Sequence, residues 1–203
     1  LLQWLGGVGF IVLAISVLPA LGVSGNQLFQ TEFSDKSAKT IPRITSLASW
    51  IGTIYLILTG ICAAAYWIAG MSGFNAIAHA MTTIATGGFS TSDASFALFD
   101  SAIIEAVAII FMILGSLPFV IYIVAARGNP KRLVSDSQVQ WFFCVLAVSI
   151  FAITIWQMID NNVDLGVALR QAAFNVTSIV TGTGYASTDY WQWGTFPAAT
   201  FLM

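Results

Sequence analysis

The sequence predicts an all-α membrane protein in which a helix–pore loop–helix module is repeated. Hydrophobic residues make up 58% of the 203 residues and charged residues only 8%, and the mean hydropathy is +0.86, far from the composition of a soluble domain. Two similar glycine-rich segments, Thr82–Asp93 and Thr177–Asp189, interrupt long apolar stretches. Irregular backbone at membrane depth is tolerated only where it is buried in protein or lines a cavity.

The apolar stretches are long enough to cross the hydrocarbon core as helices, which takes about 20 residues. In chain order they are Trp4–Leu21, Ile44–Ala69, Ala102–Ala126 and Val139–Ile159, and a fifth begins near Phe196. Because the chain starts without Met inside an apolar run, we interpret it as an internal segment of a longer protein.

Charge placement predicts the orientation of the chain. Six of the seven basic residues lie in two short loops, Gly22–Arg43 and Arg127–Ser137. The positive-inside rule places both loops in the cytoplasm, so the glycine-rich segments face the outer side. The seventh basic residue, Arg170, is expected to pair with Asp164, Asp160 or Asp189 at the outer rim.

The predicted domain boundaries follow from these spans and loops. The segments are the second transmembrane helix of a preceding module (1–21), a cytoplasmic loop (22–43), a complete helix–pore loop–helix module (44–126), a second cytoplasmic loop (127–138), and a next module truncated in its second helix (139–203).

Each predicted module contains a short helix that dips into the membrane. In the first, Gly70–Gly73 ends the outgoing helix, residues 74–91 re-enter the membrane, and Pro118 kinks the returning span. In the second, Asp164 is a candidate N-cap for a dipping helix over Leu165–Val180.

The glycine-rich segments have the composition of a cation filter. A dehydrated alkali cation needs several oxygen ligands, which selectivity filters supply as backbone carbonyls, and aligned carbonyls need glycine at some positions. The dipping helices would aim their negative C-terminal ends at such a cation. The candidate filter residues, with K⁺ as the transported ion, are Ala85, Thr86, Gly87, Gly88, Phe89, Val180, Thr181, Gly182, Thr183, Gly184 and Tyr185.

The two candidate segments are related by a repeat with one irregularity. Gly87 and Gly182 are 95 residues apart, whereas Asp93 and Asp189 are 96 apart, which indicates one inserted residue around Thr183. Phe89 and Tyr185 hold matching places, and both are expected to pack outward and brace their loops.

Three polar residues near the segments have more than one interpretation. Glu105 lies early in a span, where ionisable groups are rare. It either snorkels toward the outer surface or pairs with a neighbour, or it takes part in permeation. His79 and Asn175 lie on the dipping helices and are expected to tie the filter to the scaffold by hydrogen bonds.

The sequence contains no nucleophile–base pair, metal cluster or phosphate loop, which argues against an enzyme and predicts no cofactor. Two alternatives to a K⁺ pathway stay open. One is a Na⁺-selective relative. The other is a non-conducting structural or assembly subunit whose glycine-rich loops only pack helices.

Three stretches resemble the Trk/Ktr/HKT cation transporter superfamily, with the bacterial TrkH-type potassium uptake proteins the most similar branch. ATGGFST at 85–91 and VTGTGYA at 180–186 resemble the second and third filter loops of that family. LQWLGGVGFIVL at 2–13 is similar to the start of the second helix of its first module.

The resemblance implies four modules around one pseudo-fourfold, potassium-channel-like pore, and K⁺ uptake across the bacterial inner membrane by a multi-pass protein. It also implies a homodimer that binds a cytosolic nucleotide-binding regulatory subunit. The signature glycines by this resemblance are Gly88 and Gly184, with Gly87 and Gly182 as the alternative register. The deepest ligands would then come from around Ala85, Thr86, Val180 and Thr181.

Overall fold

A computed structural model describes residues 1–7, 9, 44–126, 128–194 and 197, and every regular element in this part of the chain is helical. Residues 2–7 form a short helix. The other elements are α3 (Ile44–Ile68), α4 (Gly73–Ile84), η1 (Ser95–Leu98), α5 (Ala102–Ser116), α6 (Phe119–Ala126), α7 (Arg132–Ser135), α8 (Ser137–Asp160), α9 (Leu165–Val180) and η2 (Tyr190–Trp193). The predicted loop at 22–43, most of the predicted span Trp4–Leu21 and most of the predicted helix from Phe196 onward lie outside the described residues.

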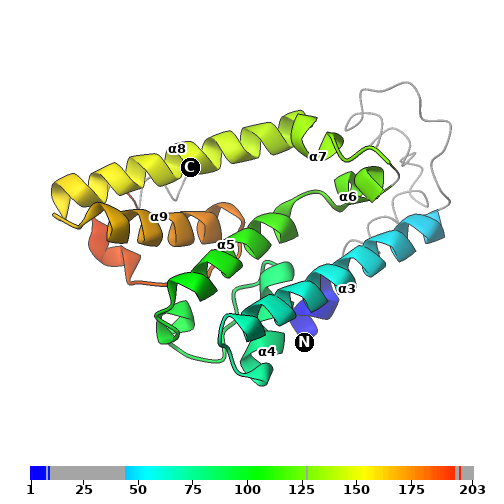
Figure 1. The fold of residues 1–203 in the computed structure, drawn as a ribbon, viewed down its shortest axis with the longest axis horizontal. Helices are drawn as coiled ribbons and strands as arrows, with labels where there is room; N and C mark the ends of the chain where they lie inside the picture. Colours follow the sequence, from blue (N-terminus) through cyan, green and yellow to red (C-terminus); the bar gives the residue numbers. More distant parts are fainter. Residues whose placement is uncertain (8, 10–43, 127, 195–196, 198–203) are drawn as a thin grey trace.

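The helices form two pairs that meet at α5. The long helix α3 packs against the short helix α4, the long helix α8 packs against the short helix α9, and α5 lies between the pairs in contact with α4 and α9 (Figure 1). By length and composition, two of the described helices could cross a membrane, over Ser49–Ile68 and Ser137–Asp160. The pair α5 and α6 passes the same test together.

Local sequence explains where the short helices begin. Gly70 has a φ of +109°, so the chain turns away from the helical course shortly after α3. The Ser72 side chain then caps α4 by accepting a hydrogen bond from the Asn75 amide. Asp164 caps α9 by accepting a hydrogen bond of 3.0 Å from the Gly166 amide. The predicted break at Gly70–Gly73, the predicted cap at Asp164 and the predicted helix Leu165–Val180 are therefore confirmed.

The returning span of the first unit is broken more sharply than the predicted kink. The axes of α5 and α6 differ by 88°. Leu117 is extended, as expected of a residue before proline, and Pro118 has no amide proton to donate to the preceding turn. The carbonyl oxygen of Leu114, four residues earlier, instead accepts a hydrogen bond of 2.6 Å from the Tyr122 hydroxyl.

An aromatic cluster fills the place where the two helix pairs meet. Phe96 from η1 is fully buried, and its ring centroid lies 4.4 Å from that of Tyr185, 5.2 Å from that of Phe174 and 6.1 Å from that of Tyr66. Because these rings come from both pairs, the core holds the segments after α4 and α9 next to each other.

Candidate functional site

The segments that follow α4 and α9 have the same backbone course. We call residues 85–93 loop 1 and residues 181–189 loop 2. The C-cap residues that follow the two helices are Ala85 and Thr181, which are 96 positions apart. Positive φ angles recur at the same separation: Thr86 (+48°) corresponds to Gly182 (+73°), and Gly88 (+71°) corresponds to Gly184 (+86°).

This correspondence corrects the predicted insertion at Thr183. The 96-residue separation already applies at the helix ends, so the backbones of the two loops align without an extra residue between them. The irregularity suggested by matching Gly87 to Gly182 comes from equating glycines with different backbone conformations. Of the two registers, the one that pairs Gly88 with Gly184 agrees with the φ angles.

The two loops lie directly against each other. A Cβ atom added to Gly88 would clash with the carbonyl oxygen of Thr183. Further along, the Phe96 amide donates to the Ala186 carbonyl oxygen at 3.0 Å, and the Ala186 amide donates to the Ser95 hydroxyl at 3.2 Å. By contrast, Cβ atoms at Gly182 and Gly184 would meet no described atom within 4 Å.

Tyr185 of loop 2 reaches behind loop 1. Its side chain is 1% exposed, and its hydroxyl contacts the Thr82 hydroxyl and lies 3.2 Å from both the Thr83 hydroxyl and the His79 carbonyl oxygen. Burial raises the pKa of the phenol, so Tyr185 stays protonated and can donate a hydrogen bond. Tyr185 therefore braces the loops as predicted.

Phe89, at the corresponding place in loop 1, does not brace the described structure. Its side chain is 70% exposed among the described residues, so a bracing role is confirmed for Tyr185 and stays a prediction for Phe89. The carbonyl oxygen of Phe89 does have a partner, because the Thr82 hydroxyl donates to it at 2.9 Å.

His79 and Asn175 tie the loops to their helices, as predicted. They are 96 positions apart and fully buried. Asn175 donates to the Ser187 hydroxyl at 2.9 Å and accepts from the Ser187 amide at 3.2 Å. His79 Nε2 lies 3.0 Å from the Ser90 hydroxyl.

The protonation state of His79 follows from its partners. Its Nδ1 lies 2.8 Å from the Asn75 carbonyl oxygen, which can only accept, so Nδ1 carries the proton and Nε2 accepts from Ser90. Burial lowers the pKa of His79, which favours the same neutral ring.

Arg170 does not pair as the sequence suggested. Its Nε and Nη2 atoms donate to the two carboxylate oxygens of Glu105 at 2.8 and 2.9 Å, and Nη2 lies 3.3 Å from Asp100. The expected partner Asp164 caps α9 instead. Hydrogen bonding to Glu105 is the main cause that raises the pKa of Arg170. Of the interpretations of Glu105, the structure shows the pairing.

Gln3 is a contact that sequence reasoning missed. Its amide nitrogen donates to the Gly87 carbonyl oxygen at 2.8 Å, across 84 positions of sequence, and no local pattern indicates such a contact. The carbonyl oxygens of Gly87 and Phe89 are thus both bonded by protein groups. Val180 is the last residue of α9, and the hydroxyls of Thr181 and Thr183 lie 2.8 Å apart in loop 2. Thr82, Ser90 and Ser187 were also missed as loop partners.

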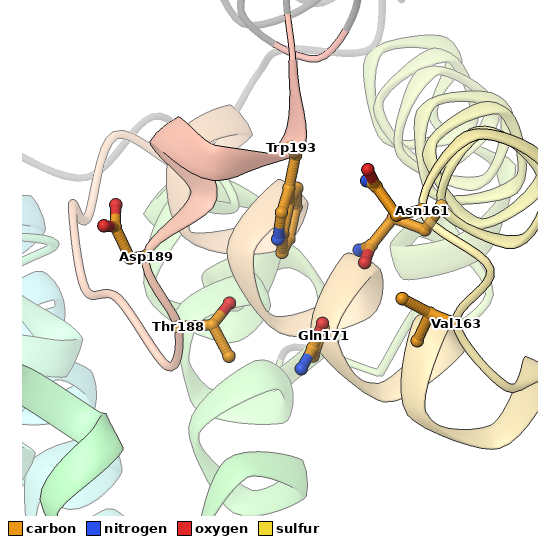
Figure 2. A pocket seen from close by; sticks show the side chains of 7 residues that line it. Asn161, Val163, Gln171, Thr188, Asp189 and Trp193 are labelled. Carbon is orange, nitrogen blue, oxygen red and sulfur yellow. The ribbon is translucent and has the colours of Figure 1, made fainter.

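A hollow of about 280 Å³ lies beside Thr188 and Asp189, at the C-terminal end of loop 2. It is lined by Gln157, Asn161, Val163, Gln171, Thr188, Asp189 and Trp193, several of which point into it in Figure 2. None of the candidate filter residues lines this hollow. It is therefore adjacent to the candidate site rather than part of it.

Fold and site together define an α-helical membrane protein in which two equivalent helix–loop units lie side by side. The chain belongs to the TrkH family, described as cation transport proteins, whose family model matches residues 1–203.

Curated relatives and a solved structure agree with this assignment. The chain is 44% identical over 203 residues to the Trk system potassium uptake protein TrkI of Halomonas elongata, covering 100% of this chain and 41% of the relative. It is 38% identical over 202 residues to the Trk system potassium uptake protein TrkH of Vibrio parahaemolyticus, covering 96% and 41%.

The crystal structure of the potassium transporter TrkH from Vibrio parahaemolyticus matches with a TM-score of 0.84 and 35% sequence identity, covering 99% of this chain and 41% of that chain. The chain thus spans about two fifths of the length of these relatives.

Proposed function

We propose that this chain is part of a K⁺ uptake protein of the bacterial inner membrane and that loops 1 and 2 form two walls of its selectivity filter. The observation that carries the proposal is the contact between two loops of equal backbone course, with Gly88 against the Thr183 carbonyl. Filters are built from carbonyl oxygens presented by several equivalent loops around one axis. The relatives named as potassium uptake proteins favour K⁺ as the ion.

The helices before the loops support the same site. The carbonyl ends of α4 and α9 adjoin the loops at Ala85 and Thr181. Each helix C-terminus carries a partial negative charge. The two helix ends therefore favour a cation near the start of both loops, a device that recurs where half-helices end at a midplane ion site.

In this proposal the residues of the candidate set have unequal roles. Thr86, Gly88, Gly182 and Gly184 supply the positive φ angles that turn successive carbonyls. Gly87 and Phe89 are bonded by Gln3 and Thr82, so we expect them to hold loop 1 in place. The remaining residues of the set flank these turns; they are Ala85, Val180, Thr181, Thr183 and Tyr185.

The assembly expected from the family resemblance stays part of the proposal. The complete pore would combine these two units with two further equivalent units, as a pseudo-fourfold multi-pass protein. The protein would form a homodimer and bind a cytosolic nucleotide-binding regulatory subunit. K⁺ is the transported ion, and the proposal requires no cofactor.

Growth of a K⁺-uptake-deficient bacterial strain tests the function. Expression of the full-length protein that contains this chain is expected to restore growth at low K⁺ and to increase Rb⁺ uptake. Failure of both, with the protein present in the membrane, would contradict the proposal. Uptake of Na⁺ in preference to Rb⁺ would instead assign a Na⁺-selective transporter.

A further inference from the structure

An ion pair between a buried carboxylate and a partly exposed guanidinium joins the two helix–loop units, since the Arg170 side chain is 38% exposed. Glu105 lies in the first turn of α5, and its side chain is only 7% exposed. Both of its carboxylate oxygens accept hydrogen bonds from Arg170 of α9. A guanidinium held at two points by one carboxylate has a fixed orientation as well as a fixed distance.

The environment of the pair is asymmetric. On its outer side, Asp100 approaches Arg170 at 3.3 Å with a side chain that is 91% exposed. An exposed, longer contact of this kind contributes little because solvent screens it. The geometry of the connection therefore depends on Glu105.

The face of α9 that carries Arg170 continues to loop 2. Arg170 and Phe174 are four positions apart and so lie on one face of the helix, and Phe174 packs against Phe96 in the aromatic cluster. The next residue, Asn175, holds Ser187 near the far end of loop 2 by two hydrogen bonds. The helix itself ends where loop 2 begins, at Thr181.

We propose that Glu105 and Arg170 are positioning residues that fix α9 against α5 and thereby set the ion selectivity of loop 2. Both ends of the loop follow the helix, through Thr181 and through Asn175. A rotation or shift of α9 would move loop 2 relative to Gly88 of loop 1, which touches it. This inference rests on the proposed function.

A role in positioning can be separated from a role in stability by the choice of variants. Removing Arg170 leaves the buried Glu105 carboxylate uncompensated, whereas removing both groups does not. Arg170→Gln alone is therefore expected to lower the amount of protein in the membrane. Glu105→Gln alone is expected to lower it less, because Arg170 is partly exposed and keeps its contact with Asp100. The double variant Glu105→Gln/Arg170→Gln is expected to keep near-normal abundance with α9 no longer held at two points.

The experiment measures inhibition of Rb⁺ uptake by Na⁺ in K⁺-uptake-deficient cells that express the full-length protein. Rb⁺ uptake by the double variant should be inhibited at a Na⁺ concentration at least about twofold lower than uptake by the wild type. This factor corresponds to the lower end of the coupling energies found between residues of one ion-pair network. In the reversed pair Glu105→Arg/Arg170→Glu, the inhibitory Na⁺ concentration should return toward that of the wild type. Asp100→Asn should shift it less than the double variant does.

A double variant with wild-type abundance and wild-type Na⁺ inhibition would overturn the inference. If the double variant does not reach the membrane, Arg170→Lys is the variant to measure. It keeps the positive charge but loses the two-point hydrogen bonding to Glu105. Unchanged inhibition of Rb⁺ uptake by Na⁺ in Arg170→Lys would overturn the inference. A wild-type protein that takes up no Rb⁺ would instead contradict the proposed function, and the inference would fall with it.

Discussion

The hydroxyl of Tyr185 in loop 2 contacts the hydroxyl of Thr82 on α4, the helix that leads into loop 1. Thr82 in turn donates to the carbonyl oxygen of Phe89 in loop 1. A continuous chain of hydrogen bonds thus runs from one loop to the other. Phe89 is the residue of loop 1 that corresponds to Tyr185, and it has no hydroxyl. Within the described chain, loop 2 therefore bonds α4 through this position, whereas loop 1 makes no matching hydrogen bond to α9.

We predict that Tyr185→Phe weakens the coupling of the two loops and leaves the fold intact. The ring can keep its packing on Phe96, while loss of the buried hydrogen bond costs about 1 kcal/mol. Na⁺ should then compete with Rb⁺ uptake more strongly than in the wild type. Thr154→Val is a matched control, because its hydroxyl donates within its own helix, to Ile150 at 2.7 Å. Equal Na⁺ competition in both variants would argue against the coupling.

We predict that His79 makes stability depend on pH. Burial lowers the pKa of His79 below its ordinary value of 6.5, so the unfolded chain binds a proton at a pH where the folded protein does not. The stabilisation is fully present above pH 6.5 and decreases as the pH falls below it, by up to about 1.4 kcal/mol per pH unit.

The matched variant for this pH dependence is His79→Asn, since the second unit has Asn175 at the corresponding position. The Tm of the detergent-solubilised protein between pH 7.5 and 5.5 should fall less steeply in His79→Asn than in the wild type. Parallel pH profiles would mean that His79 does not titrate in this range.

We predict that Tyr122→Phe destabilises the break between α5 and α6. The Leu114 carbonyl oxygen, for which Pro118 has no amide proton, would lose the donor it has in the structure. Loss of this partly buried hydrogen bond costs about 1 kcal/mol. Thermal unfolding in detergent should show a lower Tm, and an unchanged Tm would indicate that another group satisfies this carbonyl.

Local signals in the sequence were sufficient to predict the break after α3 and the cap of α9. Asp164 and the Gly70–Gly73 break act within one turn of their own positions, and the structure agrees with both. The hydrogen bonds of His79 and Asn175 were predictable for a similar reason, because each bonds a residue only 11 or 12 positions away.

The contacts between units could not be predicted in this way. Arg170 bonds Glu105 across 65 positions, and Gln3 bonds Gly87 across 84. Which carboxylate an arginine meets depends on how α5 and α9 pack, and no residue pattern within either helix determines that. Similarly, the register of the loops became clear from φ angles, which showed Thr86 in the conformation of Gly182.

Rb⁺ uptake by glycine variants tests whether loops 1 and 2 line the path of the ion. Gly88 and Gly184 both have positive φ angles, which a side chain disfavours. Gly88 also touches the Thr183 carbonyl, whereas Gly184 faces open space among the described residues. Gly52 on α3, where an added Cβ would meet no described atom within 4 Å, is the control.

We predict that Gly88→Ser abolishes selective Rb⁺ uptake, that Gly184→Ser impairs it to a smaller extent, and that Gly52→Ala leaves it unchanged, with all three proteins present in the membrane. Wild-type Rb⁺ uptake and wild-type Na⁺ competition in both Gly88→Ser and Gly184→Ser would mean that the two loops do not line the path of the ion.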